Sequence, residues 1–168
     1  MKVPRGGFDA VVLAGGRSSR LGGTPKANLI IGDRTLLEIT CLAVAEAARI
    51  VIVGPDSVVP VALPELLQAH SSTGGPELRV VREDPPFAGP AAALAAALTY
   101  PGALDPPGNS TAWLAVLSCD MPRAGELVEL LLAAADRDPS VSMAAVEGGR
   151  SQPLAALYRR DALETAVA

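Results

Sequence analysis

The residues with the most evident chemistry follow the first apolar segment of the chain. Residues 11–14 (VVLA) end at Gly15-Gly16, and the segment that comes next is rich in cations, small residues and further glycines. Glycine allows a ligand to lie directly against the backbone, and successive backbone N–H groups in a turn form a concavity that binds anions. Arg20 and Lys26, one of only two lysines in the chain, add positive charge nearby. This combination indicates a site for a phosphate.

Two familiar phosphate-binding patterns are missing from this segment. It contains no GxxxxGK[ST] pattern of the P-loop type, and no GxGxxG dinucleotide fingerprint follows the apolar segment. The residues alone therefore leave a second interpretation open, in which the segment is a glycine-rich turn with solvated charges.

Carboxylates follow two later apolar segments. Asp84 comes after residues 78–81, and Asp120 comes after residues 112–117. A carboxylate at the carboxyl end of a buried strand can hold Mg²⁺ together with phosphate oxygens and water. Both residues also have structural interpretations, because Asp120 could cap a helix that begins near Pro122 and Asp84 could be a turn residue before two prolines.

The elements that must position these residues alternate along the chain. We expect strands at residues 9–14, 49–53, 78–81, 112–117, 141–146 and 154–158. We expect helices at residues 35–48, 90–100, 126–135 and 159–168, a short helical turn at 64–69 and a solvent loop at 101–110. Strands that are apolar throughout are typical of a mostly parallel sheet covered on both faces. The sequence therefore predicts an α/β fold with three layers, α/β/α, around a mostly parallel, Rossmann-like sheet.

The distinctive residues fall where the predicted parallel strands end. Gly15-Gly16, Gly54, Asp84 and Asp120 each follow a different strand. Ligands of such sheets bind at the carboxyl ends of the strands, near the point where the strand order reverses. We expect these residues to meet at one edge of the sheet.

Composition limits the kind of protein. The 168 residues suit a single domain, and although 49% of them are hydrophobic, no apolar run reaches the ~18–20 residues of a membrane span. The apolar run near the N-terminus is too short for a signal peptide, so a cytoplasmic location is expected. A net charge of −4 argues against a nucleic-acid partner.

The few histidines and cysteines limit the metal sites and catalytic nucleophiles that the chain can form. The chain has one histidine, His70, and two cysteines that lie far apart in sequence, Cys41 and Cys119. A zinc site of Cys/His type cannot be assembled from these residues, and any Ser-His-Asp or Cys-His nucleophile would depend on His70 alone. His70 adjoins SSTGGP in an apparent loop, and we interpret it as a surface residue.

Several segments resemble one known family in order. Residues 13–22 (LAGGRSSRLG), followed by Lys26, resemble the LAGGxSxRMG…K signature of the MobA-like nucleotidyltransferases, which include the molybdenum cofactor guanylyltransferases. Residues 82–90 (REDPPFAGP), 118–122 (SCDMP) and 152–154 (QPL) are similar to later segments of that family. The resemblance covers nearly the whole chain.

The resemblance implies a fold of the nucleotide-diphospho-sugar transferase type and a set of site residues. Residues matching positions that hold the nucleotide are Leu13, Ala14, Gly15, Gly16, Arg20, Lys26, Asp84 and Asp120. Within this set, the resemblance gives catalytic roles to Arg20, Lys26 and Asp120, and it makes Asp120 the ligand of Mg²⁺.

The activity that the resemblance implies is Mg²⁺-dependent transfer of GMP from GTP to molybdopterin, with release of pyrophosphate. Its partners would be these small molecules and possible proteins of cofactor delivery or molybdoenzymes, without nucleic acid or membrane. LAGG rather than LAAG favours GTP. The alternatives are a related transferase that uses CTP or a sugar-phosphate acceptor, and a non-catalytic relative that only binds nucleotide.

Three departures from the family pattern bear on these alternatives. Gly54 stands where the family often has a polar residue, and residues 89–93 are GPAAA where the family has GPLAG. The NTP-containing segment that normally follows QPL does not occur before Ala168. We therefore expect residues 1–168 to form a single nucleotidyltransferase domain that lacks the family's C-terminal segment.

Overall fold

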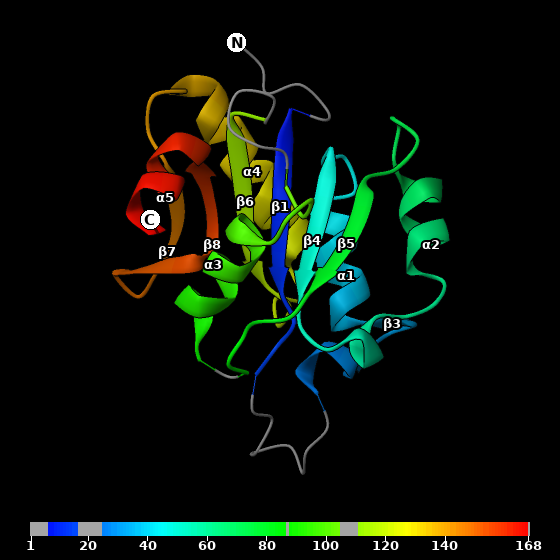
Figure 1. Ribbon diagram of the computed structural model, residues 1–168. Helices are drawn as coiled ribbons and strands as arrows, with labels where there is room; N and C mark the ends of the chain where they lie inside the picture. Colours follow the sequence, from blue (N-terminus) through cyan, green and yellow to red (C-terminus); the bar gives the residue numbers. More distant parts are fainter. Residues whose placement is uncertain (1–6, 17–24, 87, 105–110, 168) are drawn as a thin grey trace.

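A central sheet with helices on both faces organises the chain (Figure 1). The computed structural model describes residues 7–16, 25–86, 88–104 and 111–167. The strands are β1 (Phe8–Leu13), β2 (Ile30–Ile31), β3 (Arg34–Thr35), β4 (Arg49–Val53), β5 (Glu77–Val81), β6 (Trp113–Ser118), β7 (Met143–Glu147) and β8 (Arg150–Arg159). The helices are α1 (Leu36–Ala43), α2 (Leu63–His70), α3 (Pro90–Thr99), α4 (Ala124–Arg137) and α5 (Arg160–Val167), with short 3-10 helices η2 (Lys26–Asn28) and η3 (Asp56–Val58).

The main sheet has the strand order β5-β4-β1-β6-β8-β7. Strands β5, β4, β1 and β6 are parallel, whereas β8 and β7 extend the sheet in antiparallel fashion beyond β6. The chain moves outward from β1 through β4 to β5 and then returns to place β6 on the other side of β1. The strand order therefore reverses between β1 and β6, and the predicted mostly parallel α/β sheet is confirmed.

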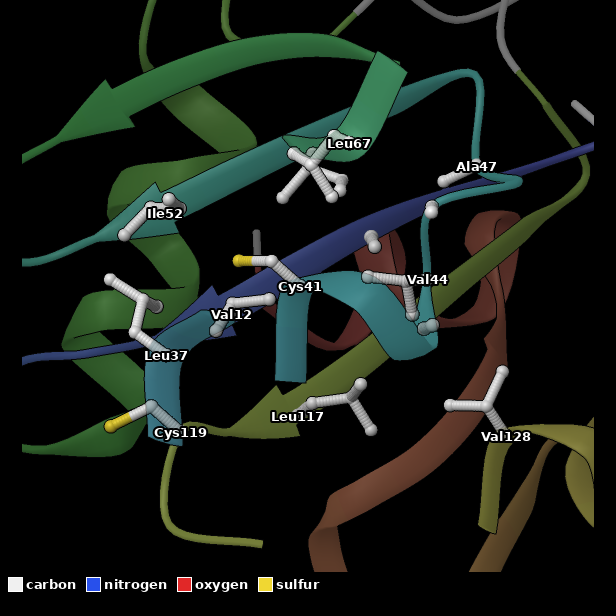
Figure 2. Packing of buried hydrophobic residues seen from close by; sticks show 14 of the residues in the cluster. Val12, Leu37, Cys41, Val44, Ala47, Ile52, Leu67, Leu117, Cys119 and Val128 are labelled. Atoms are coloured by element: carbon white, nitrogen blue, oxygen red, sulfur yellow. The ribbon is translucent and has the colours of Figure 1, made fainter. Parts of the chain in front are cut away.

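Strand β1 contributes to the hydrophobic cores on both faces of the sheet. Ala10 and Val12 pack in the core covered by α1, α2 and α4, whereas Val11 and Leu13 pack in the core covered by α3 and α5. This follows from the alternation of side chains along a strand, and all of β1 is buried. Figure 2 shows Val12 close to Cys41 of α1 in the first core. The helices thus form one layer on each face.

The parallel strands end level with one another. Leu13 pairs with Val53 of β4 and with Ser118 of β6, and Val53 pairs with Val81 of β5. The segments that follow these strands therefore emerge side by side at one edge of the sheet. This register is what brings the distinctive residues of the sequence together.

Helix α1 is shorter than its sequence pattern predicts. It begins after Thr35, whose side chain accepts a hydrogen bond from the Glu38 backbone N–H in a capping box, and it ends at Ala43 instead of continuing to Ala48. The Ala48 N–H donates to Phe8 O at 2.9 Å, and Ala48 O accepts from Glu77 N–H at 3.0 Å. These two hydrogen bonds join the backbone at Ala48 to the sheet. The chain therefore forms a turn after Ala43, where apolar spacing alone predicts a continuing helix.

Strand β8 begins earlier than its predicted start at Leu154. Only Gly148 and Gly149, with φ angles of 56° and 76°, separate it from β7, because glycine readily adopts the positive φ values of a two-residue hairpin turn. The pairing of β7 with β8 shifts register between Ala144 and Ala145, opposite the stretch that contains Pro153. Proline lacks an N–H group and is tolerated at such an irregularity.

The other expected elements are present with ends that differ by up to a few residues. They are β1, β4, β5, β6, β7, α2, α3, α4 and α5. The sequence patterns do not predict the hairpin of β2 and β3, which pair antiparallel. Part of the loop expected at residues 101–110, and Ala168 of the expected last helix, lie outside the described residues. No helix of the described part has the length and apolar character needed to cross a bilayer.

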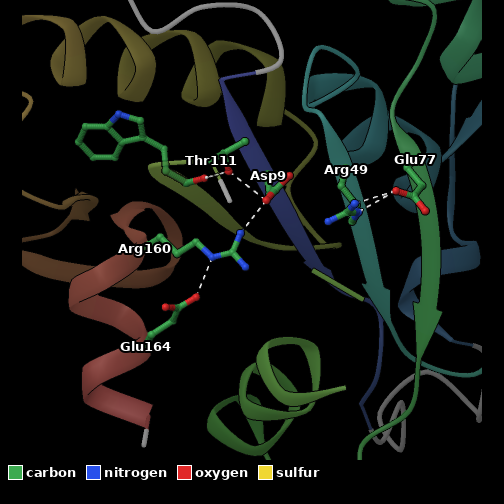
Figure 3. A network of polar contacts seen from close by, with 7 residues as sticks. Asp9, Arg49, Glu77, Thr111, Arg160 and Glu164 are labelled. Atoms are coloured by element: carbon green, nitrogen blue, oxygen red, sulfur yellow. Dashed lines mark hydrogen bonds and ion pairs between the residues drawn. The ribbon is translucent and has the colours of Figure 1, made fainter. Parts of the chain in front are cut away.

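A buried ion pair ties α5 to the amino end of β1 (Figure 3). The Arg160 Nη1 atom lies 2.8 Å from Asp9 Oδ2, and both side chains are almost fully buried. The Thr111 hydroxyl also donates to Asp9 Oδ2 at 2.9 Å, and Arg160 Nε donates to Glu164 at 2.7 Å. These contacts lie at the edge opposite the carboxyl ends of the parallel strands, and they hold the amino end of β1 in position.

Candidate active site

A cavity of about 640 Å³ opens at the carboxyl ends of the parallel strands. Its volume falls within the usual range of small-molecule sites, and it lies at the reversal of strand order, where such sheets bind their ligands. Predicted site residues that line it are Leu13, Ala14, Gly15, Gly16, Lys26 and Asp120. The structure therefore brings these residues together, and their roles toward a nucleotide stay predictions. Arg20 lies outside the described residues.

The turn after β1 forms one wall of the cavity. The Ala14 N–H donates to Val53 O at 2.8 Å, after which the backbone leaves the sheet at Gly15 and Gly16, both of which are exposed. Gly16 has a φ angle of 148°, which side-chain-bearing residues rarely adopt. An exposed turn of this kind has backbone groups available to a ligand.

The structure explains why position 54 is a glycine, which its sequence context does not reveal. A Cβ atom at this position would lie 3.1 Å from Ala14 C and 3.2 Å from Gly15 N, which are backbone atoms that cannot move aside easily. The absence of a side chain therefore lets the ends of β4 and β1 approach closely. Where the family pattern suggests a missing polar contact, the structure gives Gly54 a part in shaping the cavity, which it lines.

A cation and a carboxylate meet where the strand order reverses. Lys26 Nζ, on η2 after β1, lies 3.0 Å from Asp120 Oδ2, which follows β6. Ala27, the next residue of η2, is buried in the first core and anchors this segment. Both charged side chains keep substantial exposure, 55% for Lys26 and 38% for Asp120. They are therefore accessible to a ligand in the cavity.

Asp120 is held in its ionised form by its neighbours. Partial burial by itself would raise the pKa of its carboxyl group, but hydrogen bonds from the Ser118 hydroxyl and from Lys26, together with the charge of Lys26, lower the pKa below its ordinary value. The Ser118 hydroxyl donates to Asp120 Oδ1 at 2.6 Å, and Lys26 donates to Oδ2. The carboxylate is thus charged at neutral pH and contacted at both oxygens.

The donor set at this point suits Mg²⁺ bound with a substrate. Among the described residues, no group of three or more His, Cys, Asp or Glu side chains is arranged to hold a metal ion. The accessible carboxylate of Asp120 fits Mg²⁺, which is commonly bound through one or two carboxylates plus substrate phosphates. The alternative interpretation of Asp120 as a helix cap finds no support in α4, where Arg123 is the N-cap residue and makes no side-chain capping bond.

Glu83 lines the cavity in place of its neighbour Asp84, which the sequence suggests as the site residue. Asp84 is exposed and does not line the cavity, whereas Arg82 and Glu83 do. The Oε1 atom of Glu83 would lie 4.0 Å from a Cβ atom placed on Gly15, so this carboxylate stands next to the glycine turn. Both acidic residues lie within three residues of the end of β5. A loop has no periodicity from which to predict which of two neighbouring residues faces a cavity.

The amino end of α3 forms another part of the wall. Gly89, with a φ angle of 103°, precedes the helix and Pro90 is its first residue, as the sequence predicts. Both residues line the cavity. The partial positive charge of a helix amino end favours anions, which agrees with a site for phosphates.

The remaining candidates do not provide a nucleophile. Cys119 lines the cavity but is buried, and burial raises the pKa of its thiol to about 11. It is therefore a neutral core residue at pH 7, as the sequence suggests. His70 lies exposed at the end of α2 and does not line the cavity. From the QPL segment, Leu154 lines the cavity and Gln152 does not.

Comparisons with known proteins agree on the fold. The chain matches the model of the MobA-like NTP transferase domain over residues 10–168. No curated protein matches it in sequence. Among solved structures, it is similar to an Rv0371c homolog from Mycobacterium sp. strain JC1, with 24% identity, a TM-score of 0.61, and coverage of 98% of this chain and 75% of that chain.

Two further structures carry enzyme names. One is molybdopterin-guanine dinucleotide biosynthesis protein A from Archaeoglobus fulgidus, with 21% identity, a TM-score of 0.56, and coverage of 95% of this chain and 72% of that chain. The other is 2-C-methyl-D-erythritol 4-phosphate cytidylyltransferase from Thermus thermophilus, with 24% identity, a TM-score of 0.55, and coverage of 94% and 73%. At these identities the likeness establishes a shared fold of the nucleotide-diphospho-sugar transferase type.

Proposed function

Because the chain belongs to the MobA-like NTP transferase family, we propose that it transfers GMP from GTP to molybdopterin in a Mg²⁺-dependent reaction that releases pyrophosphate. The observation that carries this proposal is the contact of Lys26 with Asp120 beside the glycine turn after β1. One cavity is lined there by a backbone turn, a cation and a carboxylate. Together these groups suit a nucleoside triphosphate.

The reaction requires little covalent chemistry from the protein. An oxygen of the acceptor's terminal phosphate attacks the α-phosphorus of the nucleotide, and the bond from that phosphorus to the bridging oxygen of the β-phosphate breaks. Pyrophosphate leaves with the electron pair of that bond. No enzyme nucleophile is needed, which agrees with the buried, neutral thiol of Cys119 in the cavity wall.

The residues of the chain act by binding and by electrostatic stabilisation. The backbone of the turn at Gly15 and Gly16 lies against the nucleotide, and Lys26 moves from Asp120 to the phosphates, where its charge stabilises the departing pyrophosphate. We assign Arg20 a parallel role from its place in the sequence motif. Asp120 would hold Mg²⁺, which supplies charge neutralisation at the phosphates when it is bound.

The identity of the substrates rests on the sequence motif. The LAGG segment is similar to the guanylyl members of the family, and one structural relative is a molybdopterin-guanine dinucleotide biosynthesis protein. A second candidate uses CTP, since another relative of the same fold is a cytidylyltransferase. The two candidates share the phosphate chemistry at Lys26 and Asp120 and differ in the base that the cavity accepts.

Thermal unfolding with each nucleotide tests the proposal. The full chain is heated with GTP, CTP, ATP or UTP, with and without Mg²⁺. A ligand at 100 times its Kd adds about 2.7 kcal/mol of stability, which corresponds to roughly 5–10 °C for a domain of this size. We expect a Mg²⁺-dependent rise in Tm for GTP, and pyrophosphate release when molybdopterin is added. A rise for CTP alone would favour the second candidate, and no rise for any nucleotide would contradict both.

Asp120→Asn tests the proposed role of the Asp120 carboxylate in transfer. The substitution preserves the size of the side chain and removes its charge, so we expect transfer to fall by about 100-fold while the fold is retained. Near-normal turnover of this variant would contradict the role assigned to Asp120.

A further inference from the structure

We propose that Ser118 is a positioning residue that fixes the carboxylate of Asp120 for a divalent cation bound together with the nucleotide. The inference rests on the proposed function, because it concerns how the site holds its metal. It depends on the hydrogen bond from the Ser118 hydroxyl to Asp120 Oδ1, 2.6 Å long, and on the location of both residues at the cavity.

Ser118 is well placed to act as a fixed support. It is the last residue of β6, and its pairing with Leu13 in the centre of the sheet sets its backbone position. Asp120 lies two residues further on, beyond the end of the strand. A short side chain with one rotatable bond to its hydroxyl therefore extends the rigidity of the sheet to a carboxylate on a loop.

The two oxygens of Asp120 have partners of different mobility. Oδ1 accepts from Ser118, whereas Oδ2 contacts Lys26 Nζ at 3.0 Å. Lys26 has a long side chain, 55% exposed, that can move to a phosphate. The Ser118 hydroxyl is attached through a short side chain to β6 and stays in place when a ligand binds. Departure of Lys26 therefore leaves Oδ2 available to a cation while Oδ1 remains held.

The contribution of such a support to metal affinity is substantial. The terminal torsion of an aspartate side chain is broad, so an unsupported carboxylate samples several orientations. Hydrogen-bonding partners that orient a ligand typically change metal affinity by about 10–100-fold when they are removed. We therefore expect removal of the Ser118 hydroxyl to weaken the metal-dependent part of nucleotide binding and to leave the rest unchanged.

The test measures the affinity of the full chain for GTP with Mn²⁺ and with EDTA. The ratio of the affinity with Mn²⁺ to the affinity with EDTA gives the gain in affinity that the cation provides. For Ser118→Ala, we expect this gain to fall about 10-fold while the affinity in EDTA stays at the wild-type value. The electron paramagnetic resonance spectrum of Mn²⁺ in the complex should also change, because the orientation of a ligand affects it directly.

Matched variants separate the hydroxyl from the packing. Ser118→Thr retains a hydroxyl and should keep the gain, whereas Ser118→Val, which matches threonine in shape, should lose it, and both β-branched residues suit a strand if the alanine variant folds poorly. Ser140→Ala is the control, because the Ser140 hydroxyl also donates to an aspartate two positions away, Asp138 Oδ1 at 2.5 Å, and neither residue lines the cavity. This control should behave as wild type.

Each outcome decides the inference. If wild-type protein shows a Mn²⁺-dependent gain that Ser118→Ala and Ser118→Val retain, the positioning role is wrong and the proposed function stands. If these variants weaken GTP binding equally in Mn²⁺ and in EDTA, the hydroxyl has a general structural role and the inference is overturned. If the wild-type protein shows no gain from Mn²⁺ or binds no GTP, the proposed function fails and the inference fails with it.

Discussion

Lys26 Nζ and Asp120 Oδ2 lie 3.0 Å apart although 94 positions separate the two residues in the chain. The contact joins the segment after β1 to the segment after β6 across the point where the strand order reverses. Because both side chains are partly exposed, the ion pair stabilises the fold by no more than about 1 kcal/mol. Its importance lies in the cavity, where it keeps a cation and a carboxylate together within reach of a ligand.

Replacement of Lys26 should impair transfer without unfolding the protein. For Lys26→Met we expect kcat/KM to fall about 100- to 1,000-fold, because the proposed role of Lys26 is to stabilise the leaving pyrophosphate with its positive charge. Steady-state pyrophosphate release measures the effect, and the Tm should stay within a few degrees of wild type. Arg137→Met, an exposed cation at the end of α4, is the control. Equal activity of the Lys26 variant and the control would refute the role of Lys26.

A methyl group at Gly54 should destabilise the fold. The Cβ atom of Gly54→Ala would lie 3.1 Å from Ala14 C, so the ends of β4 and β1 must separate, and we expect a loss of about 1–3 kcal/mol in the free energy of unfolding. Urea denaturation measures this loss. Gly125→Ala in α4 is the matched control, because a Cβ there would meet nothing within 4 Å, and we expect a gain of about 0.5–1 kcal/mol. Similar values for both variants would contradict the close approach.

The buried pair of Asp9 and Arg160 should show strong coupling. Arg160→Met removes the Arg160 cation from beside the buried Asp9 carboxylate, and we expect a cost of about 3–5 kcal/mol in the free energy of unfolding. The double variant Asp9→Leu with Arg160→Met removes both charges and should recover much of this loss. A double-mutant cycle by urea denaturation tests the expectation, and simple addition of the two single losses would disprove it.

Alkaline pH should destabilise the protein through its thiols. Burial raises the pKa of Cys41 above its ordinary value of 9.0 and raises the pKa of Cys119 to about 11. The folded protein therefore retains these protons where the unfolded chain loses them, so the stabilisation is present below pH 9 and is lost as the pH rises toward about 11. Urea denaturation from pH 8 to 11 measures this decline, which should be smaller in Cys119→Ala. An identical decline in that variant would assign the effect to other groups.

Prediction from sequence succeeded where the determinants are local. Apolar runs bounded by glycine and proline located β1, β4, β5 and β6, and the pair Gly89-Pro90 located the start of α3. Prediction was wrong where tertiary contacts override local preference. Ala48 hydrogen-bonds to Phe8 and Glu77 rather than continuing α1, although the alanines around it favour a helix.

The sequence by itself determined the α/β class, the family and the residues with chemistry, because residue type, short spacing and motif order are properties of the chain. Only the tertiary structure decided which of these residues meet. The register of Leu13 with Val53 and Ser118 sets the strand ends level, and this places Asp120 beside Lys26. The structure also shows that Glu83 rather than Asp84 lines the cavity. The contact of Lys26 with Asp120 joins segments that are distant in the chain, and its geometry depends on strand order and packing, which no local pattern encodes.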